Sequence, residues 1–151
     1  MNTETIRKAV PADAPRLAAL CGQLGYTVTL EEVGARLAAV IDDPRHALFA
    51  AAGPDGTALG WVHALVVVYL EAPPFVEIGG LVVDADYRRT GLGNALMARA
   101  EEWAAAQGVG MVRLRSNVTR GEAHAFYRAR GYEVSKTQYA FVKLLAPPAA
   151  A

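Results

Sequence analysis

The segment from residue 88 to residue 94 contains the residue types that bind a phosphate group. Its members, in order, are Arg88, Arg89, Thr90, Gly91, Leu92, Gly93 and Asn94. An apolar run typical of a strand precedes this segment, and an amphipathic helical pattern follows it. The first amide groups of a helix have no partner within that helix, and the helix macrodipole places about half a positive charge there. Because glycine lets these amides approach an anion closely and arginine adds positive charge, the segment predicts a diphosphate site.

Two common nucleotide-binding loops do not match this segment. The dinucleotide fingerprint needs a third glycine at a fixed offset, and a P-loop needs a closing Gly-Lys-Ser/Thr; the segment contains neither. A lone Gly-x-Gly is more often a surface loop that serves only the entry into a helix. The preceding strand, the two arginines and the amphipathic helix together favour a phosphate site.

A second segment supports this interpretation through a resemblance. Arg88-x-x-Gly91-x-Gly93 resembles the Arg/Gln-x-x-Gly-x-Gly/Ala signature of the GNAT superfamily of acyl-CoA-dependent N-acyltransferases. Residues 123–132 read Ala-His-Ala-Phe-Tyr-Arg-Ala-Arg-Gly-Tyr and resemble the late helix of that family, Ala-x-x-Phe/Leu-Tyr-x-x-x-Gly-Phe/Tyr. The order of the expected strands and helices is also that of the family, so the resemblance covers nearly the whole chain.

The resemblance implies a role for the strand that precedes the phosphate loop. In the family this strand splays away from its neighbour, and its backbone groups contact the pantetheine arm of coenzyme A. In this chain those groups belong to Leu81, Val82 and Val83. The same amides are placed to stabilise the negative charge that develops on the acetyl oxygen when an amine attacks. The adjacent glycines Gly79 and Gly80 predict a bulge that opens the splay.

Two residues in the later part of the chain are implied in cofactor binding. Tyr127 matches the family tyrosine that protonates the departing thiolate of coenzyme A, although Phe126 and Tyr127 also fit a packing pair. Asn117 follows a strand, where many relatives place an asparagine that bonds the pantetheine amides. It lies ten residues before Tyr127, a longer gap than the family usually shows, so a turn-forming asparagine is an equal alternative.

A general base must remove a proton from the incoming ammonium, and Glu77 is the leading candidate. Glu77 and Leu81 are an even number of positions apart on the same strand (the same sequence parity), so their side chains are expected on the same face. A bulge at the glycine pair would change the face of Glu77. A hydrogen-bonded strand residue and a substrate anchor are at least as good interpretations of Glu77. The histidines at 46, 63 and 124 have no metal-ligand spacing, and we expect each to be packed or on the surface.

Composition limits the other function classes. Lys plus Arg and Asp plus Glu are balanced at 15 each, so no overall field recruits nucleic acid, and no apolar run is long enough to cross a membrane. Cys21 is the only cysteine and can form no intramolecular disulfide, which suits a reducing cytoplasm. The length of 151 residues suits one domain over residues 1–151, with residues from about 146 to 151 as a frayed tail.

Periodicity and turn signals predict the element order β-α-α-β-β-β-α-β-α-β. Strands are expected over residues 5–9, 46–52, 57–70, 75–83, 109–116 and 137–145. Helices are expected after an N-cap at Asp13, after a Thr29–Glu32 capping box, after the phosphate loop as far as about Gln107, and over 123–130. The expected fold class is α/β. It is a single GNAT-like domain with a mixed, mostly antiparallel central sheet, helices on both faces and a splayed strand pair at the cofactor site.

The activity that we expect is transfer of an acetyl group from acetyl-CoA to a primary amine by direct attack in a ternary complex. The acceptor is left open among a small amine, an aminoglycoside-like compound and a peptide amine. No metal, nucleic acid or membrane partner is expected. The alternative is a non-catalytic acyl-CoA-binding regulatory module. Family members often pair through their late strands, so a homodimer is considered, although the sequence identifies no surface for it.

Overall fold

The computed structural model describes residues 5–146 and divides the chain into two compact units, Met1–Arg115 and Ser116–Ala151. The larger unit contains a five-stranded sheet in the order β1-β2-β3-β4-β5. Its strands are β1 (Thr5–Lys8), β2 (His46–Ala52), β3 (Ala58–Tyr69), β4 (Ala72–Val83) and β5 (Val112–Leu114). The pairs up to β4 are antiparallel and the β4–β5 pair is parallel, which confirms the mixed, mostly antiparallel sheet.

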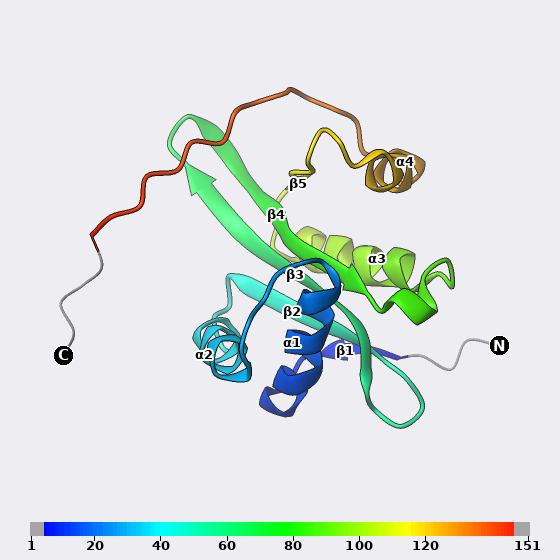
Figure 1. Ribbon diagram of the computed structural model, residues 1–151. Helices are drawn as coiled ribbons and strands as arrows, with labels where there is room; N and C mark the ends of the chain where they lie inside the picture. The colour runs from blue at the N-terminus through cyan, green and yellow to red at the C-terminus, as the bar shows by residue number, and fades with distance from the viewer. Residues whose placement is uncertain (1–4, 147–151) are drawn as a thin grey trace. The chain divides into compact units, whose positions relative to one another are not determined.

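Helices cover both faces of this sheet (Figure 1). The helices of the larger unit are α1 (Ala14–Gln23), α2 (Leu30–Val40) and α3 (Leu92–Ala106). Trp61 packs against the apolar cluster that α1 and α2 form, whereas a Cβ atom on the adjacent Gly60 would lie 3.2 Å from Leu96 of α3. Successive strand residues point to opposite faces, so Trp61 marks the face of β3 that α1 and α2 cover, and Gly60 marks the face that α3 covers.

The first two helices begin in different ways. At α2, Glu32 N–H donates to Thr29 Oγ1 at 3.1 Å and Thr29 N–H donates to Glu32 Oε1 at 2.9 Å, which confirms the capping box. At α1, Asp13 occupies the N-cap position but forms no side-chain cap. Its carboxylate instead accepts hydrogen bonds from Val10 N–H and from both terminal nitrogens of Arg7, each at 2.8 Å. The prediction of a capping Asp13 was therefore wrong, because an arginine on β1 binds the same oxygens.

The glycine pair in β4 forms the predicted bulge. His63 pairs with Gly80 and Ala64 pairs with Ile78, so Gly79 has no partner in the register. One extra residue reverses the face of every side chain that follows it. Glu77 lies opposite Leu65 and shares the α1/α2 face with Gly80, so the sequence parity of Glu77 with Leu81 does not hold in the structure.

The smaller unit contains α4 (Gly121–Ala129), which confirms the predicted late helix with a start two residues earlier. The predicted strand over 137–145 is wrong, because the described residues after 132 form no strand. Strand backbone requires a neighbour for its hydrogen bonds, and this segment has none among residues 5–146. Its apolar side chains are exposed, with Tyr139 at 91% and Phe141 at 94%. Most of the predicted tail, 147–151, lies outside the described residues.

Among residues 5–146, no helix is both long and apolar enough to cross a membrane.

Candidate active site

The phosphate loop ends at a left-handed glycine. Gly91 is the N-cap of α3 with a φ of 92°, a conformation that favours glycine, and α3 begins at Leu92 without a side-chain cap. The backbone bond from Ala95 N–H to Gly91 O, at 3.0 Å, closes the first turn of the helix. The amides of Leu92 and Gly93 precede that bond and so have no intrahelical acceptor. A Cβ atom on Gly91 would meet no atom within 4 Å, so the space beside this residue is open.

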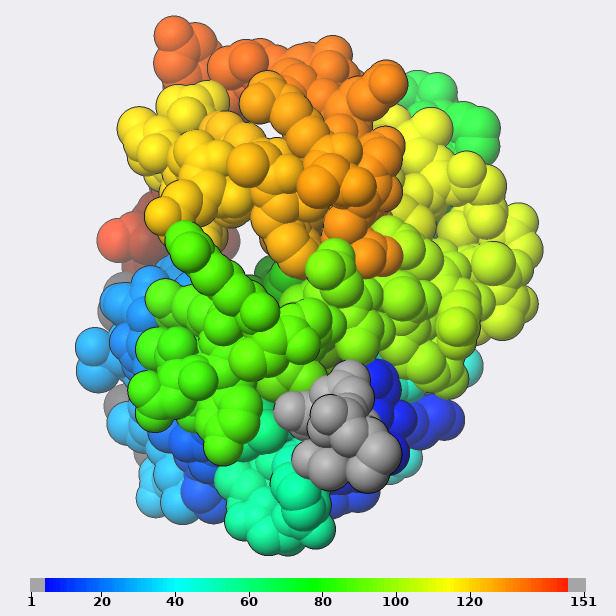
Figure 2. Space-filling view, turned by 90° about the vertical axis from the view of Figure 1, so that its right-hand side faces the viewer, coloured from blue at the N-terminus to red at the C-terminus, as the bar shows by residue number. Residues whose placement is uncertain are grey.

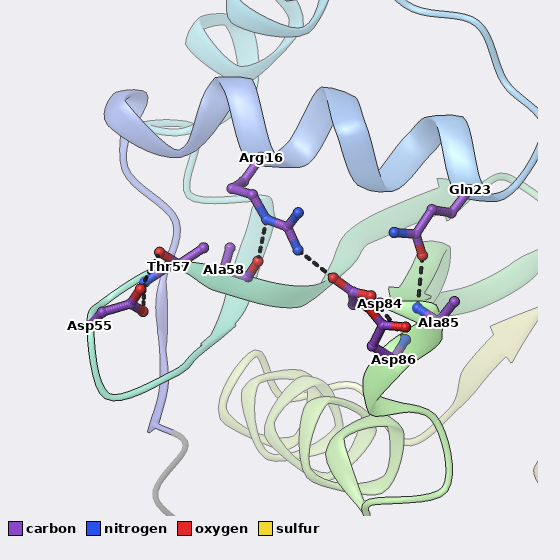
Figure 3. A network of polar contacts seen from close by, with 8 residues as sticks. All are labelled: Arg16, Gln23, Asp55, Thr57, Ala58, Asp84, Ala85 and Asp86. Atoms are coloured by element: carbon purple, nitrogen blue, oxygen red, sulfur yellow. Dashed lines mark hydrogen bonds and ion pairs between the residues drawn. The ribbon is translucent and has the colours of Figure 1, made fainter.

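The helix α1 holds the base of this loop (Figure 3). Arg16 donates to Asp84 Oδ2 at 2.7 Å and to Ala58 O at 2.9 Å, which joins α1 to β3 and to the end of β4. Gln23 Oε1 accepts from Ala85 N–H at 2.8 Å. Asp84 also accepts from Asp86 N–H at 3.0 Å, and this bond, followed by the bond from Arg16, lowers the pKa of the Asp84 carboxyl. These contacts give the loop a rigid attachment.

The rest of the loop is at the surface. The short turn η2 (Ala85–Tyr87) leads into it, and Thr90 Oγ1 donates to Tyr87 O within it. Arg88 and Arg89 are exposed, and Arg89 has a positive φ of 63°. In Figure 2 the green segment that carries these residues lies on the face toward the viewer. Exposed guanidinium groups beside open helix amides suit a diphosphate, so this part of the chain fits coenzyme A.

The strands β4 and β5 part directly after a short paired region. Their parallel pairing covers only Val76–Ile78 and Val112–Leu114, so β4 continues for five residues without β5 beside it. Asp84 N–H donates to Leu59 O of β3 at 2.8 Å. Backbone groups alternate in direction along an antiparallel ladder, so those of Leu81 and Val83 point to the side that β5 has left. By the same alternation the groups of Val82 point to β3, opposite Trp61. Of the three residues predicted to contact pantetheine, Leu81 and Val83 therefore have backbone groups free of the β3 ladder, whereas those of Val82 bond to β3.

Glu77 lies on the α1/α2 face of β4, beside the parting of the strands. One carboxylate oxygen, Oε1, lies 3.3 Å from Nε of Arg115, and the glutamate side chain is 23% exposed. Arg113, opposite Glu77 on β5, stacks its guanidinium over the Phe75 ring at 4.3 Å. This face therefore combines one carboxylate with two guanidinium groups at the surface.

A histidine pair lies on the same face and was missed by the sequence reasoning. His46 Nδ1 and His63 Nε2 are 2.9 Å apart, and the two rings are stacked with their centroids separated by 5.2 Å. A Cβ atom on Gly79 would lie 3.3 Å from Nδ1 of His63. Burial, followed by the neighbouring His46, lowers the pKa of His63 below its ordinary value. Only the hairpin register brings these two histidines together, since 17 positions separate them in the chain.

The smaller unit contains the two remaining predicted site residues. Tyr127 lies on α4, with its ring edge-to-face against Phe126 at 5.2 Å and against Tyr132 at 5.9 Å. Burial raises the pKa of the Tyr127 phenol. Asn117 forms a turn, because its Oδ1 accepts from Thr119 N–H at 3.1 Å and from Thr119 Oγ1 at 2.9 Å. The turn-forming interpretation of Asn117 thus has a structural basis, while its contact with pantetheine stays a prediction.

Comparison with known proteins identifies the family of this fold. The family model described as the acetyltransferase (GNAT) family matches residues 17–132. The chain is 30% identical over 152 residues to aminoglycoside N(6')-acetyltransferase type 1 of Stenotrophomonas maltophilia, and the match covers 98% of each protein. This agreement favours an enzyme over a non-catalytic acyl-CoA-binding module.

Solved structures show the same fold. Aminoglycoside antibiotic 6'-N-acetyltransferase AAC(6')-Ih from Acinetobacter baumannii superposes with a TM-score of 0.82 at 18% identity, over 95% of this chain and 99% of that chain. AAC(6')-Iy in complex with the bisubstrate analog CoA-S-monomethyl-acetylneamine superposes with a TM-score of 0.84 at 20% identity, over 95% and 100% of the two chains. The chain belongs to the GNAT acetyltransferase family and is an N-acetyltransferase that uses acetyl-CoA.

Proposed function

We propose that this enzyme acetylates a primary amine of an aminoglycoside, at the 6' position. The observation that carries this proposal is the relation over 98% of both chains to an aminoglycoside N(6')-acetyltransferase at 30% identity. The partly exposed Glu77 carboxylate, in the short region where β4 pairs with β5, supports it, since a carboxylate attracts a cationic acceptor.

The proposed mechanism is direct attack of the amine in a ternary complex. Acetyl-CoA supplies an activated acetyl thioester. The amides at the start of α3 bind its diphosphate together with Arg88, Arg89 and the other members of the loop, which are Thr90, Gly91, Leu92, Gly93 and Asn94. The outward backbone groups of Leu81 and Val83 bind the pantetheine arm and stabilise the charge on the acetyl oxygen, an effect worth about 3 kcal/mol per donor. Val82 supports these groups through its pairing with β3.

Two residues of the smaller unit complete the proposal. Tyr127 donates a proton to the departing thiolate, and its raised phenol pKa is consistent with that role because it keeps the hydroxyl protonated at neutral pH. Asn117 is the candidate for a bond to the pantetheine amides. Its Oδ1 belongs to the turn with Thr119, which leaves the amide nitrogen as the donor for such a bond.

Glu77 is the group that we propose to bind the acceptor ammonium, and it is also the candidate base predicted from the sequence. Arg115 is its ion-pair partner at 3.3 Å. Arg115 is 82% exposed, so its guanidinium can leave the carboxylate when a ligand ammonium replaces it.

The test is an acceptor assay that follows thiol release from acetyl-CoA. Neamine, which carries a 6'-amine, is compared with paromamine, which carries a hydroxyl group at that position. We expect turnover with neamine and a rate at least 100-fold lower with paromamine, with mass spectrometry placing the acetyl group on the 6' nitrogen. Turnover restricted to small aliphatic amines or peptides would refute the aminoglycoside assignment and leave the acetyltransferase assignment intact.

We also propose that the two units form one catalytic domain, because the family match runs from residue 17 to residue 132 and so crosses the boundary at Arg115.

We propose a homodimer from the segment 137–145, which has the sequence of a strand but no partner strand among the described residues. Its apolar side chains are exposed by 80% or more at Tyr139, Phe141, Val142, Leu144 and Leu145. Light scattering after chromatography should give the mass of two chains. Deletion of residues 137–151 should lower the measured mass to that of one chain.

We propose that the enzyme acts in the cytoplasm, on the basis of the single thiol of Cys21 and the use of acetyl-CoA.

A further inference from the structure

The face of the sheet beside Gly79 contains an imidazole pair to which the proposed reaction assigns no role. His46 pairs with Leu65 in the β2–β3 register, and Leu65 pairs with Glu77 in the β3–β4 register. Directly paired residues share a face, so His46 and Glu77 are on one side of the sheet. His63 is two residues before Leu65 and therefore also lies on that side.

One ring nitrogen of His63 is engaged, and the other faces the bulge. Nε2 lies 2.9 Å from Nδ1 of His46, so one of these two nitrogens carries the shared proton. Nδ1 lies toward Gly79, where a Cβ atom would be 3.3 Å away. Gly79 is exposed and is the first residue of β4 beyond its pairing with β5. Because Gly79 has no side chain, no Cβ atom occupies the space beside Nδ1 of His63, at the point where the two strands part.

We propose that His63 accepts the proton of the attacking amine, and that His46 is the positioning residue that holds the His63 ring. This inference rests on the proposed amine acetylation and names the group that takes the proton. When Nε2 of His63 donates to Nδ1 of His46, the lone pair of the neutral His63 ring is on Nδ1 and faces Gly79. An N–H bond of the ammonium breaks, the proton bonds to Nδ1, and the electron pair stays on the amine nitrogen for the attack. The imidazolium later returns this proton to solvent.

The surroundings of the pair suit a base that is neutral before the reaction. Burial and the neighbouring His46 lower the pKa of His63, so its ring is uncharged at neutral pH. On the same face, β4 contributes Glu77, and β5 contributes Arg113 and Arg115. The helices α1 and α2 face this side with an apolar cluster. His46 also lines a hollow of about 640 Å³, and the charged residues in that lining are Lys8, Asp42 and Asp43.

Glu77 and His63 then have different roles, which steady-state kinetics can distinguish. Glu77 binds the ammonium, so its loss weakens acceptor binding. His63 removes the proton, so its loss lowers the rate of the bound complex, by the factor of about 100 to 10,000 that is typical of a general base.

The closing experiment compares the wild type with His63→Gln and Glu77→Gln. Glutamine places its amide nitrogen near the former Nε2, so it keeps a donor toward His46 while it removes the base. We expect His63→Gln to lower kcat at least 100-fold, to leave acetyl-CoA affinity within twofold by calorimetry, and to abolish the fall in kcat/KM below neutral pH. Glu77→Gln should raise the acceptor KM and keep that acid limb. An acid limb that persists in His63→Gln and disappears in Glu77→Gln would overturn the inference.

One further measurement keeps the inference testable on its own, and the activity results separate its failure from that of the proposed function. Nitrogen NMR of the wild-type imidazoles must show the neutral His63 ring protonated at Nε2, and a proton on Nδ1 would overturn the proposal whether or not the variants fold. If the wild type binds acetyl-CoA but acetylates no amine, the proposed function fails as well. If it acetylates amines and His63→Gln retains the wild-type kcat, only the role of His63 fails.

Discussion

Arg16 of α1 lies 2.7 Å from the carboxylate of Asp84, the residue that directly follows β4 on the way to the phosphate loop. The carboxylate also accepts the N–H of Asp86, and the guanidinium also donates to Ala58 O. Through these bonds the first helix sets the direction in which the chain leaves the sheet, and with it the position of the loop that precedes α3.

Removal of this link should weaken the cofactor site. We expect Asp84→Asn to lower the free energy of unfolding by about 1–2 kcal/mol, because charged hydrogen bonds at a partly exposed guanidinium are lost. Acetyl-CoA affinity should fall severalfold in calorimetry, because the loop loses its attachment. The matched control is Arg36→Gln, which removes an exposed pair with Glu32 at 3.4 Å and should change neither quantity. Equal effects in the two variants would contradict a special role for Asp84.

The ion pair between Arg7 and Asp13 should make the free energy of unfolding depend on pH. The bonds from Arg7, ahead of the opposing effect of burial, hold the pKa of Asp13 below its usual value. A carboxyl with a lowered folded pKa contributes stability that is present above the ordinary Asp pKa of about 4 and is lost as pH falls through the folded value. In urea titrations, wild type should therefore exceed Asp13→Asn in stability at pH 7, and the difference should shrink at pH 3. A difference that does not change with pH would show that the pair is not the cause.

The left-handed conformation of Gly91 predicts a strained alanine. With a φ of 92°, Gly91→Ala should cost about 1–2 kcal/mol of stability and weaken acetyl-CoA binding, because the helix amides shift. Gly34 is the matched control. It lies inside α2, and a Cβ atom there would meet no atom within 4 Å. Gly34→Ala should raise the melting temperature, since alanine is the better helix former by about 1 kcal/mol.

Gly80, the glycine at the end of the bulge, should not tolerate substitution by a larger residue, for a steric reason. A Cβ atom on Gly80 would lie 2.7 Å from Cη2 of Trp61, whose ring packs against the α1/α2 cluster. We expect Gly80→Ala to destabilise the protein by about 1–3 kcal/mol, as overpacking does. The double variant with Trp61→Leu should recover part of this loss in denaturant unfolding, and purely additive effects would contradict the contact.

The Tyr127 hydroxyl should affect rate more than binding. Tyr127→Phe keeps the ring contacts with Phe126 and Tyr132, so the melting temperature should change by no more than a few degrees. We expect kcat for thiol release to fall about 10- to 100-fold with acetyl-CoA affinity unchanged. Tyr139→Phe is the control, because Tyr139 is 91% exposed. A Tyr127→Phe enzyme with wild-type kcat would leave the ring with a packing role only.

The features that the sequence predicted correctly depend on local chemistry. The capping box at Thr29 and Glu32, the Gly91 helix entry and the bulge at the double glycine each require particular residues within a few positions. The wrong predictions concern partners that lie outside the predicted helix or strand. Arg7 binds the carboxylate expected to cap α1, and the strand expected over 137–145 has no neighbour among the described residues.

The family and its cofactor were therefore determined by the sequence itself, because a phosphate loop is a continuous segment whose amides and charges act together. Tertiary structure alone decided the arrangement of the reacting face. The bulge at Gly79 reverses the parity of Glu77, and the backbone direction separates Leu81 and Val83 from Val82. The β2–β3 register brings His46 to His63. A side chain's face changes with a single inserted residue, so these relationships exist only once the strands have paired.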